Sequence, residues 1–529
     1  PRARPASKNA DGTVAREAKN PFPFTPALFP CGPQHPLMIV APHTGAASGA
    51  GATLDREPPS SLTAPIGAFI GWSGANDRSV FVPMSDRYGG VMVFGEAGAG
   101  KSTLSHDLWA FDLLQRERPS LPGSVGSRNA MIAFESKDGR GALSWLHFVH
   151  HLGMANEAVV FDLNDPATPA IEMFAGGGTA YDRAAKFVDQ MVYAWADEGT
   201  VKLEPALTAL FALSLSVSPE IAAAGGCRPG SVLWYASVLA GAEADGDKGA
   251  LRLFESIRDA AASAEVAAGG DPNDPFSPAS VQRTSIAQTV TRSGAYFRGS
   301  ATQRSNEFDS ARRRIAALRA CDAWFDPARP KLDWADLIDR HRIVVVNTGT
   351  PMRDGVVPLD ARSTQRLSAM LMFGLMQAIQ SRCSGWEQQG RAVSVFADEL
   401  SIVAKASPDV VEWLREKGRS FGVRAAFATQ SMYQLDPKVL AVVLGFSTTM
   451  WMQLGREAGF IEMARRQLDI DEPGVWTDQV SRIPKFYGIL QTKVAGVKQP
   501  ACMVSIARLE GMSIDEVRRL NAGGSDALR

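Results

Sequence analysis

The sequence feature that most constrains this chain is a glycine-rich segment that directly follows an apolar run. The run covers residues 91–94, and the segment matches G-x-x-x-x-G-K-[ST]. Placed after a strand and before a helix, predicted here over residues 104–114, this pattern indicates a phosphate-binding loop for ATP or GTP. Its backbone N–H groups would face the β-phosphate, its lysine the β- and γ-oxygens, and its serine Mg²⁺. The predicted nucleotide-binding residues are Gly95, Glu96, Ala97, Gly98, Ala99, Gly100, Lys101, Ser102 and Thr103.

Length and composition indicate a multidomain globular protein. A chain of 529 residues is too long for one compact core, so we expect two or three domains. The formal net charge of −1 gives no overall attraction to nucleic acid, so DNA contacts would need a local patch or a ring of subunits. The five cysteines lie far apart without paired spacing, which argues against a zinc site and a disulfide framework.

The longest apolar stretch, residues 439–454, is interrupted by hydroxyl and amide side chains and falls short of a membrane span. We predict a buried helix followed by a buried strand there. No signal peptide is recognisable, and we expect a cytoplasmic protein. Because the chain begins with Pro1 rather than Met, an association with the cytoplasmic face of the inner or cell membrane would be made through a region outside these residues.

The pattern along the chain predicts an α/β core interrupted by an all-α insertion. Continuous apolar runs favour parallel strands that are covered by helices on both faces. The runs are residues 130–134, 158–161, 343–346, 392–397, 425–429 and 448–452, with hairpins at 67–72 and 79–83 and at 488–491 and 503–506. Between them, helical patterns cover residues 183–196, 205–217, 231–242 and 249–266, followed by a loop at 269–278.

These patterns give five predicted segments. They are a Pro-, Ala- and Gly-rich arm with a short strand at 37–41 (1–63), the first part of the nucleotide-binding core (64–180), an all-α insertion domain (181–330), the second part of the core (331–510), and a C-terminal helix and tail (511–529).

Two adjacent acids, Asp398 and Glu399, follow the apolar run at 393–397. At the end of a buried strand beside a phosphate loop, Asp398 would hold Mg²⁺ together with Ser102, and Glu399 would polarise the attacking water. The alternative is a helix N-terminus with two favourable acids.

A helix that carries Arg419 precedes the next strand, and Gln430 follows that strand. Gln430 could sense the γ-phosphate or position water, or it could simply satisfy nearby backbone groups. Arg419 could act as an arginine finger on a neighbouring subunit's nucleotide, or it could be a solvated cation at a helix end.

Taken in order, these motifs resemble the HerA/FtsK superfamily of RecA-like motor ATPases. Within it, the chain looks most like the VirD4/TraG coupling proteins of type IV secretion and conjugation. The resemblance covers residues 65–510 and is carried by the phosphate loop, the helical insertion, and residues 159–166, 396–400, 418–419 and 428–435. It implies a RecA-like P-loop core with a mostly parallel sheet and an inserted all-α domain.

The resemblance also implies a function. Such a protein forms a ring, usually a homo-hexamer, binds ATP and Mg²⁺, and couples ATP hydrolysis to moving DNA or a DNA–protein substrate toward a secretion channel. Its partners would be DNA and components of the conjugation or type IV secretion machinery.

Two departures from the family pattern leave alternatives open. The family often has Asp-x-Lys-Gly after its second strand, where this chain has Glu135-Ser136-Lys137-Asp138-Gly139. Coupling proteins also usually carry N-terminal membrane helices, and none is recognisable in these residues. A VirB4-type secretion ATPase and a HerA-like DNA-processing translocase share the core motifs. A nucleotide-dependent switch or scaffold is a further alternative, although a catalytic carboxylate at Glu399 favours hydrolysis.

Two clusters outside these motifs have less specific interpretations. Eight arginines between Arg283 and Arg319 could contact phosphates, or they could form the solvated face of a helix. His147, His150 and His151 have a spacing that could seat a metal on one helical face, but no acid or cysteine accompanies them.

Overall fold

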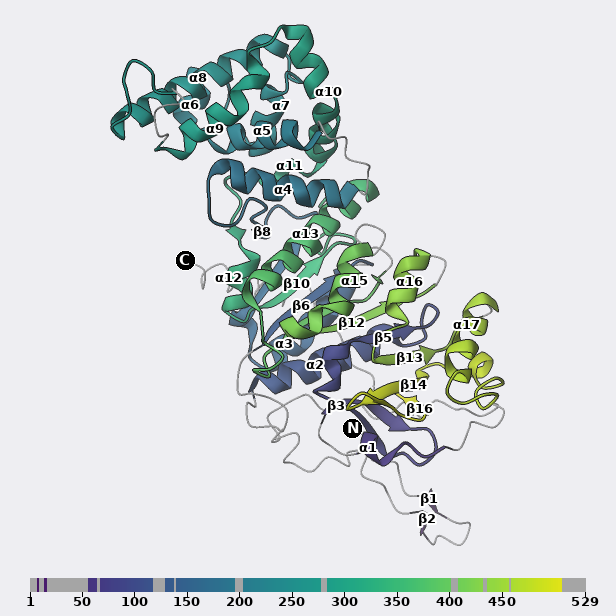
Figure 1. Cartoon of the computed structure of the whole chain (residues 1–529). Coiled ribbons are helices and arrows are strands. Elements are labelled where there is room, and N and C mark those ends of the chain that lie inside the picture. The colour runs from purple at the N-terminus through teal and green to yellow at the C-terminus, as the bar shows by residue number, and fades with distance from the viewer. Residues whose placement is uncertain are drawn as a thin grey trace. The chain divides into compact units, whose positions relative to one another are not determined.

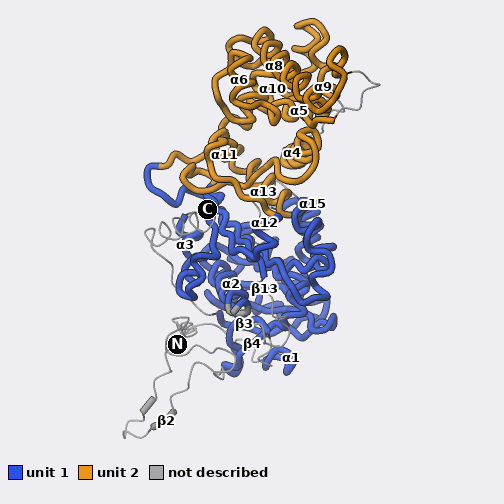
Figure 2. Tube along the Cα trace, turned by 90° about the vertical axis from the view of Figure 1, so that its left-hand side faces the viewer, with its two compact units in different colours: residues 1–162, 335–355, 376–529 blue, residues 163–334, 356–375 orange. Residues whose placement is uncertain are grey.

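The structure is a computed structural model, shown in Figure 1 with its helices and strands labelled. It describes residues 7–8, 14–16, 56–63, 67–117, 129–137, 139–195, 203–276, 283–400, 408–431, 435–455 and 458–506. The predicted strand at 37–41 and the predicted C-terminal helix and tail at 511–529 lie outside these residues. The chain divides into two compact units, coloured separately in Figure 2. Unit 1 comprises Pro1–Asp162, Ala335–Gly355 and Met376–Arg529, and unit 2 comprises Leu163–Trp334 and Val356–Leu375.

Unit 1 is built around a twelve-stranded sheet with the order β4-β3-β16-β14-β13-β5-β12-β11-β6-β10-β7, in which β15 pairs with β14. From β13 to β7 all neighbours are parallel, and from β13 to β4 they are antiparallel. The parallel strands are β5 (Val91–Phe94), β6 (Ala130–Glu135), β7 (Ala158–Asp162), β10 (Ile343–Asn347), β11 (Val393–Ala397), β12 (Val423–Thr429) and β13 (Thr448–Met452). The others are β3 (Gly67–Ser73), β4 (Ser79–Pro83), β14 (Tyr487–Val494), β15 (Val497–Lys498) and β16 (Cys502–Ser505). The predicted mostly parallel α/β sheet is confirmed.

The parallel strands read as continuous apolar runs because both faces of the sheet are covered. In β5, Val91 and Val93 belong to one apolar cluster with residues of α2 (Lys101–Glu117) and α3 (Gly139–His151). On the opposite face, Phe94 stacks on Trp451 with ring centroids 4.4 Å apart, and it meets Phe460 of α17 (Ala458–Asp469) at 5.8 Å. Unit 1 also contains α1 (Ser60–Thr63), α15 (Pro408–Glu416) and α16 (Pro437–Val443).

The apolar stretch at residues 439–454 forms most of α16 and all of β13, as predicted. In the part of the chain that the structure describes, no helix combines the length and the apolar character needed to cross a bilayer.

Unit 2 is almost entirely helical and has a two-stranded parallel sheet of β8 (Ala170–Ile171) and β9 (Lys331–Leu332). Its helices include α4 (Ala180–Trp195), α5 (Leu203–Leu215), α6 (Pro219–Ala224), α7 (Val232–Leu239), α8 (Gly246–Ala267), α9 (Ser285–Ser293), α10 (Ala301–Leu318) and α11 (Asp322–Phe325). Side chains define several helix starts; for example, Ser300 and Gln303 form a reciprocal capping box at α10. The predicted insertion boundaries at 181 and 330 fall inside this unit and stay a prediction.

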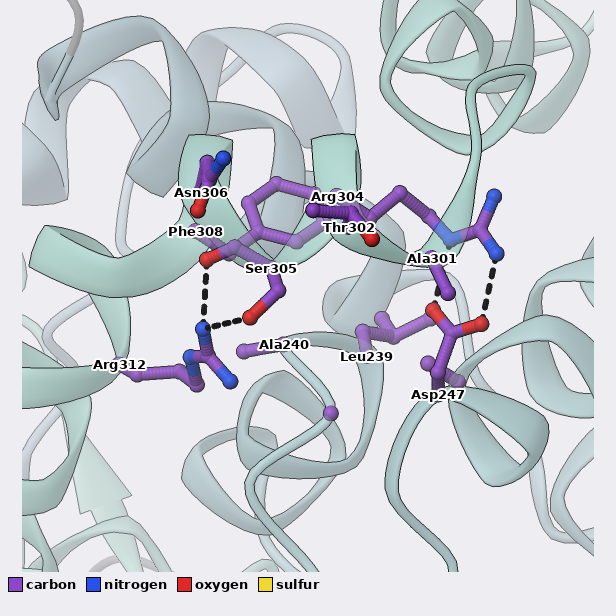
Figure 3. A pocket seen from close by; sticks show the side chains of 12 residues that line it. Leu239, Ala240, Asp247, Ala301, Thr302, Arg304, Ser305, Asn306, Phe308 and Arg312 are labelled. Carbon is purple, nitrogen blue, oxygen red and sulfur yellow. Dashed lines mark hydrogen bonds and ion pairs between the residues drawn. The ribbon is translucent and has the colours of Figure 1, made fainter.

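The arginine-rich stretch of unit 2 is largely engaged within the unit. Arg304 is only 6% exposed, and its guanidinium pairs with both Asp247 oxygens at 2.6 and 2.7 Å. Arg312 donates to the Ser305 carbonyl and hydroxyl oxygens at 2.5 and 2.9 Å. Both arginines line a cavity of about 390 Å³, and Figure 3 shows their side chains there. Other arginines also have partners: Asp309 for Arg313, Glu243 for Arg319, and the Trp195 ring for Arg314. The interpretation of this stretch as a solvated helix face is wrong for Arg304.

A buried ion pair fixes the segment that leads into β5. Arg87, in the short 3₁₀ helix η1 (Asp86–Gly89), donates to both oxygens of Asp112 in α2 at 2.9 and 3.1 Å. The two side chains are 0% and 3% exposed. The neighbouring Tyr88 hydroxyl donates to the Arg391 carbonyl at 3.0 Å and accepts from Arg424 at 2.9 Å. These contacts tie η1, which leads into β5, to α2 and to β12.

We predict that Asp112→Ala lowers the free energy of unfolding by about 3–5 kcal/mol, because it leaves the Arg87 guanidinium buried and unpaired. Urea unfolding followed by circular dichroism measures the loss. Lys438→Gln, which removes an exposed lysine paired with Asp409 and Glu412, is the control and should change stability little. A loss for Asp112→Ala no larger than that of the control would contradict the role of this pair.

Candidate active site

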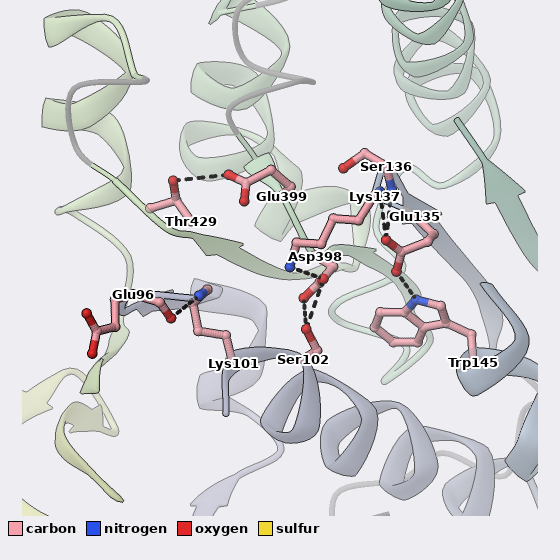
Figure 4. Close-up of polar contacts among 10 residues, drawn as sticks. All are labelled: Glu96, Lys101, Ser102, Glu135, Ser136, Lys137, Trp145, Asp398, Glu399 and Thr429. Carbon is pink, nitrogen blue, oxygen red and sulfur yellow. Dashed lines mark hydrogen bonds and ion pairs between the residues drawn. The ribbon is translucent and has the colours of Figure 1, made fainter. Parts of the chain in front are cut away.

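The phosphate loop lies between the carboxyl end of β5 and the amino end of α2. Gly100 has a φ of +111°, and a Cβ there would lie 2.7 Å from the Phe486 ring, so only glycine fits. Phe486 also donates its backbone N–H to the Ala99 carbonyl at 2.9 Å. Figure 4 shows the Lys101 ammonium folded back onto the Glu96 carbonyl, to which it donates at 2.7 Å. The loop is therefore held in its turn by the segment that precedes β14.

Lys101 is a buried cation with an exposure of only 3%. Burial, and then the positive charge of Lys137, lower its pKa from 10.5 to about 8. A desolvated ammonium of this kind gains strongly from a bound anion, because the anion replaces the hydration that burial has removed. Lys101 is thus well suited to contact phosphate oxygens.

Ser102 and Asp398 meet across the sheet. The Ser102 hydroxyl, in the first turn of α2, lies 2.8 and 2.9 Å from the two Asp398 carboxylate oxygens and donates to them. Asp398 follows β11, which is separated from β5 only by β12, so the carboxyl ends of these parallel strands bring the two residues together. The fold therefore brings together the two residues that were predicted to hold Mg²⁺, and their role in metal binding stays a prediction.

A second lysine completes this cluster. The Lys137 ammonium, from the loop after β6, donates to Asp398 Oδ2 at 2.5 Å (Figure 4). Burial alone would raise the pKa of Asp398, but the Lys137 charge, with hydrogen bonds from Lys137 and Ser102, outweighs it and lowers the pKa. Burial would likewise lower the pKa of Lys137, but the Asp398 charge raises it. Both groups are therefore charged at neutral pH.

The donor set fits Mg²⁺. A hydroxyl and a carboxylate are the hard oxygen ligands that this ion prefers, and the carboxylate already attracts a cation here. Ser102 and Asp398 are the residues that would hold the metal, directly or through water.

Glu399 and Gln430 lie at neighbouring strand ends. The Thr429 hydroxyl, at the end of β12, lies 3.4 Å from Glu399 Oε1 as a long hydrogen bond, and Glu399 is 6% exposed. Gln430 follows Thr429 directly and is half-buried. This places the amide and the carboxylate at the same edge of the sheet as the phosphate loop.

Arg419 lies elsewhere. It belongs to the 3₁₀ helix η5 (Gly418–Phe421), which precedes β12, so it sits at the amino end of the strand whose carboxyl end carries Thr429. A strand of this length separates the two ends by about 20 Å. The Arg419 Nε donates to Glu387 Oε1 at 2.6 Å, and the side chain is 61% exposed. Arg419 therefore does not join the phosphate loop of its own subunit.

Sequence reasoning missed the contributions of Lys137, Glu135, Trp145 and Thr429. Glu135 Oε1 accepts the backbone N–H groups of Ser136 and Lys137 at 3.1 and 3.0 Å, and Oε2 accepts the Trp145 indole N–H at 3.2 Å. Burial, and then the Asp398 charge, raise the Glu135 pKa to about 7. Glu135 and Lys137 follow the apolar run at residues 130–134, and this position could have predicted their place in the site, since loops after parallel strands meet at one edge of the sheet.

The histidines on α3 form no comparable site. The His147 and His151 rings pack edge to face with centroids 4.2 Å apart. Within the described ranges, no group of three or more histidine, cysteine or acidic side chains is arranged to hold a metal ion.

Among known proteins, the similarity of this chain lies in its fold. No family model and no curated protein matches the chain. Among solved structures, it is similar to the plasmid coupling protein TrwB in complex with the GTP analogue GDPNP, at 14% identity and a TM-score of 0.53, covering 87% of this chain and 97% of TrwB. The complex of TrwB with an ATP analogue gives 13% identity and the same TM-score and coverage. VirB4 of Thermoanaerobacter pseudethanolicus follows at 11% identity and a TM-score of 0.42, covering 85% and 98%.

The TrwB likeness extends over most of both chains, so it includes residues of the sheet unit and of the helical unit. The predicted RecA-like P-loop fold with an inserted helical domain, and the predicted likeness to coupling proteins, are confirmed at the level of the fold.

We predict that Lys101→Ala weakens binding of a fluorescent ATP analogue by about 100-fold or more, because the ammonium is the main side-chain counter-charge to the phosphates. Equilibrium titration measures the affinity, and Lys438→Ala, which removes an exposed lysine, is the matched control. An unchanged affinity in a folded Lys101→Ala protein would contradict the assignment of the phosphate loop.

Proposed function

We propose that this protein is an ATPase motor that couples ATP hydrolysis to the translocation of DNA or a DNA–protein substrate. The observation that carries the proposal is the convergence of Lys101, Ser102, Asp398 and Glu399 at one edge of the sheet. A phosphate counter-charge, a metal-binding pair and a buried second acid are the parts that phosphoryl transfer to water requires.

Each residue has a role in the proposed reaction. Lys101 neutralises the β- and γ-phosphates, and Ser102 and Asp398 hold Mg²⁺, which when bound withdraws charge from the phosphate oxygens. Glu399, anchored near Thr429, takes a proton from the attacking water. Gln430 follows the same strand end, where its amide can orient that water or contact the γ-phosphate.

We further propose that the protein works as a homo-hexameric ring. Arg419 is exposed and lies at the strand end remote from the phosphate loop of its own chain, and we propose that it acts on the nucleotide of a neighbouring subunit. In a ring its guanidinium would stabilise the charge that develops on the γ-phosphate.

Conjugative DNA transfer is the proposed setting. TrwB, which shares the fold, is described as a bacterial conjugative coupling protein. Accordingly, DNA and type IV secretion components are the proposed partners, with the protein at the cytoplasmic face of the membrane. A VirB4-type ATPase, a HerA-like translocase and an ATP-dependent switch are the alternatives.

Steady-state ATPase assays with and without single- and double-stranded DNA test this function. We predict that DNA stimulates ATP turnover.

In single-turnover hydrolysis, we predict that Glu399→Gln lowers the rate by about 10²- to 10⁴-fold, because the amide cannot accept the proton from the attacking water. That variant should still bind ATP. Glu462→Gln, which alters an exposed acid on α17, is the control. Slow turnover that no DNA stimulates would favour a switch, and wild-type hydrolysis by Glu399→Gln would contradict the assignment of the base.

The role of Arg419 has its own test. We predict that Arg419→Ala and Glu399→Gln proteins are each inactive, and that mixing them restores part of the ATPase activity, because mixed rings regain interfaces with one intact Glu399 and one intact Arg419. Arg466→Ala, which removes an exposed arginine on α17, should stay active. No recovery in mixed rings shown to form, or normal hydrolysis by Arg419→Ala alone, would contradict action across an interface.

A further inference from the structure

The carboxylate proposed to hold the metal already has a resident cation. Lys137 Nζ lies 2.5 Å from Asp398 Oδ2, and Ser102 Oγ lies 2.8 and 2.9 Å from the two oxygens of the same carboxylate. The Asp398 side chain is 3% exposed, whereas that of Lys137 is 33% exposed. The acid is thus fixed in the interior, and the lysine reaches it from the solvent side.

The backbone that presents Lys137 is built for this contact. One oxygen of the buried Glu135 accepts the Lys137 N–H at 3.0 Å, and the other accepts the Trp145 indole N–H at 3.2 Å. Gly141, in the first turn of α3, leaves room for that carboxyl group, because a Cβ there would overlap it. Glu135, one methylene longer than aspartate, fits against this glycine and fixes the backbone N–H groups of Ser136 and Lys137, whereas the Lys137 side chain is partly exposed.

Three positive charges compete for this small volume once a divalent cation binds. Lys101 and Lys137 already repel each other, since the positive charge of Lys137 helps to lower the pKa of Lys101. A divalent ion beside Ser102 and Asp398 would add to this repulsion, and the partly exposed lysine is the group that can leave.

We propose that Lys137 is a positioning residue that holds the Asp398 carboxylate as its resident counter-ion, and that a divalent cation binds this site by displacing the Lys137 ammonium. The inference rests on the proposed function. It goes beyond that function because the Lys137 side chain then responds to metal binding, and its competition for Asp398 sets the concentration of divalent cation at which the site fills.

Replacing Lys137 should move metal affinity in opposite directions for two variants. Lys137→Gln removes the competitor, so the protein should bind Mn²⁺, in the absence of nucleotide, about tenfold more tightly than the wild type. Lys137→Arg can hold Asp398 through two hydrogen bonds and should bind Mn²⁺ several-fold more weakly. Electron paramagnetic resonance of free Mn²⁺ during titration measures both affinities without any hydrolysis.

Controls separate the local effect from net charge and from the proposed function. Lys438→Gln removes one exposed lysine charge and should leave Mn²⁺ affinity unchanged, and Asp398→Asn should abolish the site.

Thermal melting gives a second readout. Without Mn²⁺, Lys137→Gln should have a lower melting temperature than the wild type, because Asp398 has lost its counter-ion, and Mn²⁺ should reverse this loss. Equal Mn²⁺ affinities for wild type, Lys137→Gln and Lys137→Arg would overturn the displacement. If instead the Mn²⁺ affinities shift as expected but no variant or wild type binds ATP, the proposed function fails and the resident counter-ion stands.

Discussion

The active-site edge of this protein depends on one buried carboxylate. Asp398 is almost without solvent contact, and a charged carboxylate in that position is stable only if cations and hydrogen-bond donors surround it. The strand order β5-β12-β11-β6 supplies both, because the phosphate loop follows β5 and the Lys137 loop follows β6. The parallel core therefore brings a serine, an acid and a lysine from three distant parts of the chain to one point.

Much of this arrangement could be predicted from the sequence. The phosphate loop was predicted from its glycine and lysine spacing after an apolar run. Asp398-Glu399 follow an apolar run that is typical of a buried strand. Continuous apolar runs predicted the parallel strands, and short apolar runs bounded by turn residues predicted the antiparallel ones. These signals are local, since each lies within about ten residues, and local patterns are what one sequence records most clearly.

The remaining features depend on contacts across the sheet. Lys137 reaches Asp398 from 261 residues away in the chain, and nothing local to either residue specifies that β6 and β11 are neighbours. The arginines of unit 2 were hard to interpret for the same reason, because Arg304 is neutralised by Asp247 from another helix. Glu135, which accepts the Ser136 and Lys137 N–H groups, also contacts the Trp145 indole, and its local sequence does not specify that contact.

We propose that Asp398 anchors the metal of a nucleotide-hydrolysing site and that Lys137 is its exchangeable counter-ion. A crystal structure of the protein with Mg²⁺ and a non-hydrolysable ATP analogue tests this most directly. We expect the metal beside Ser102 and Asp398, the phosphates against Lys101, and the Lys137 ammonium withdrawn from Asp398. A nucleotide bound elsewhere, or a bound metal with Lys137 still paired to Asp398, would contradict it.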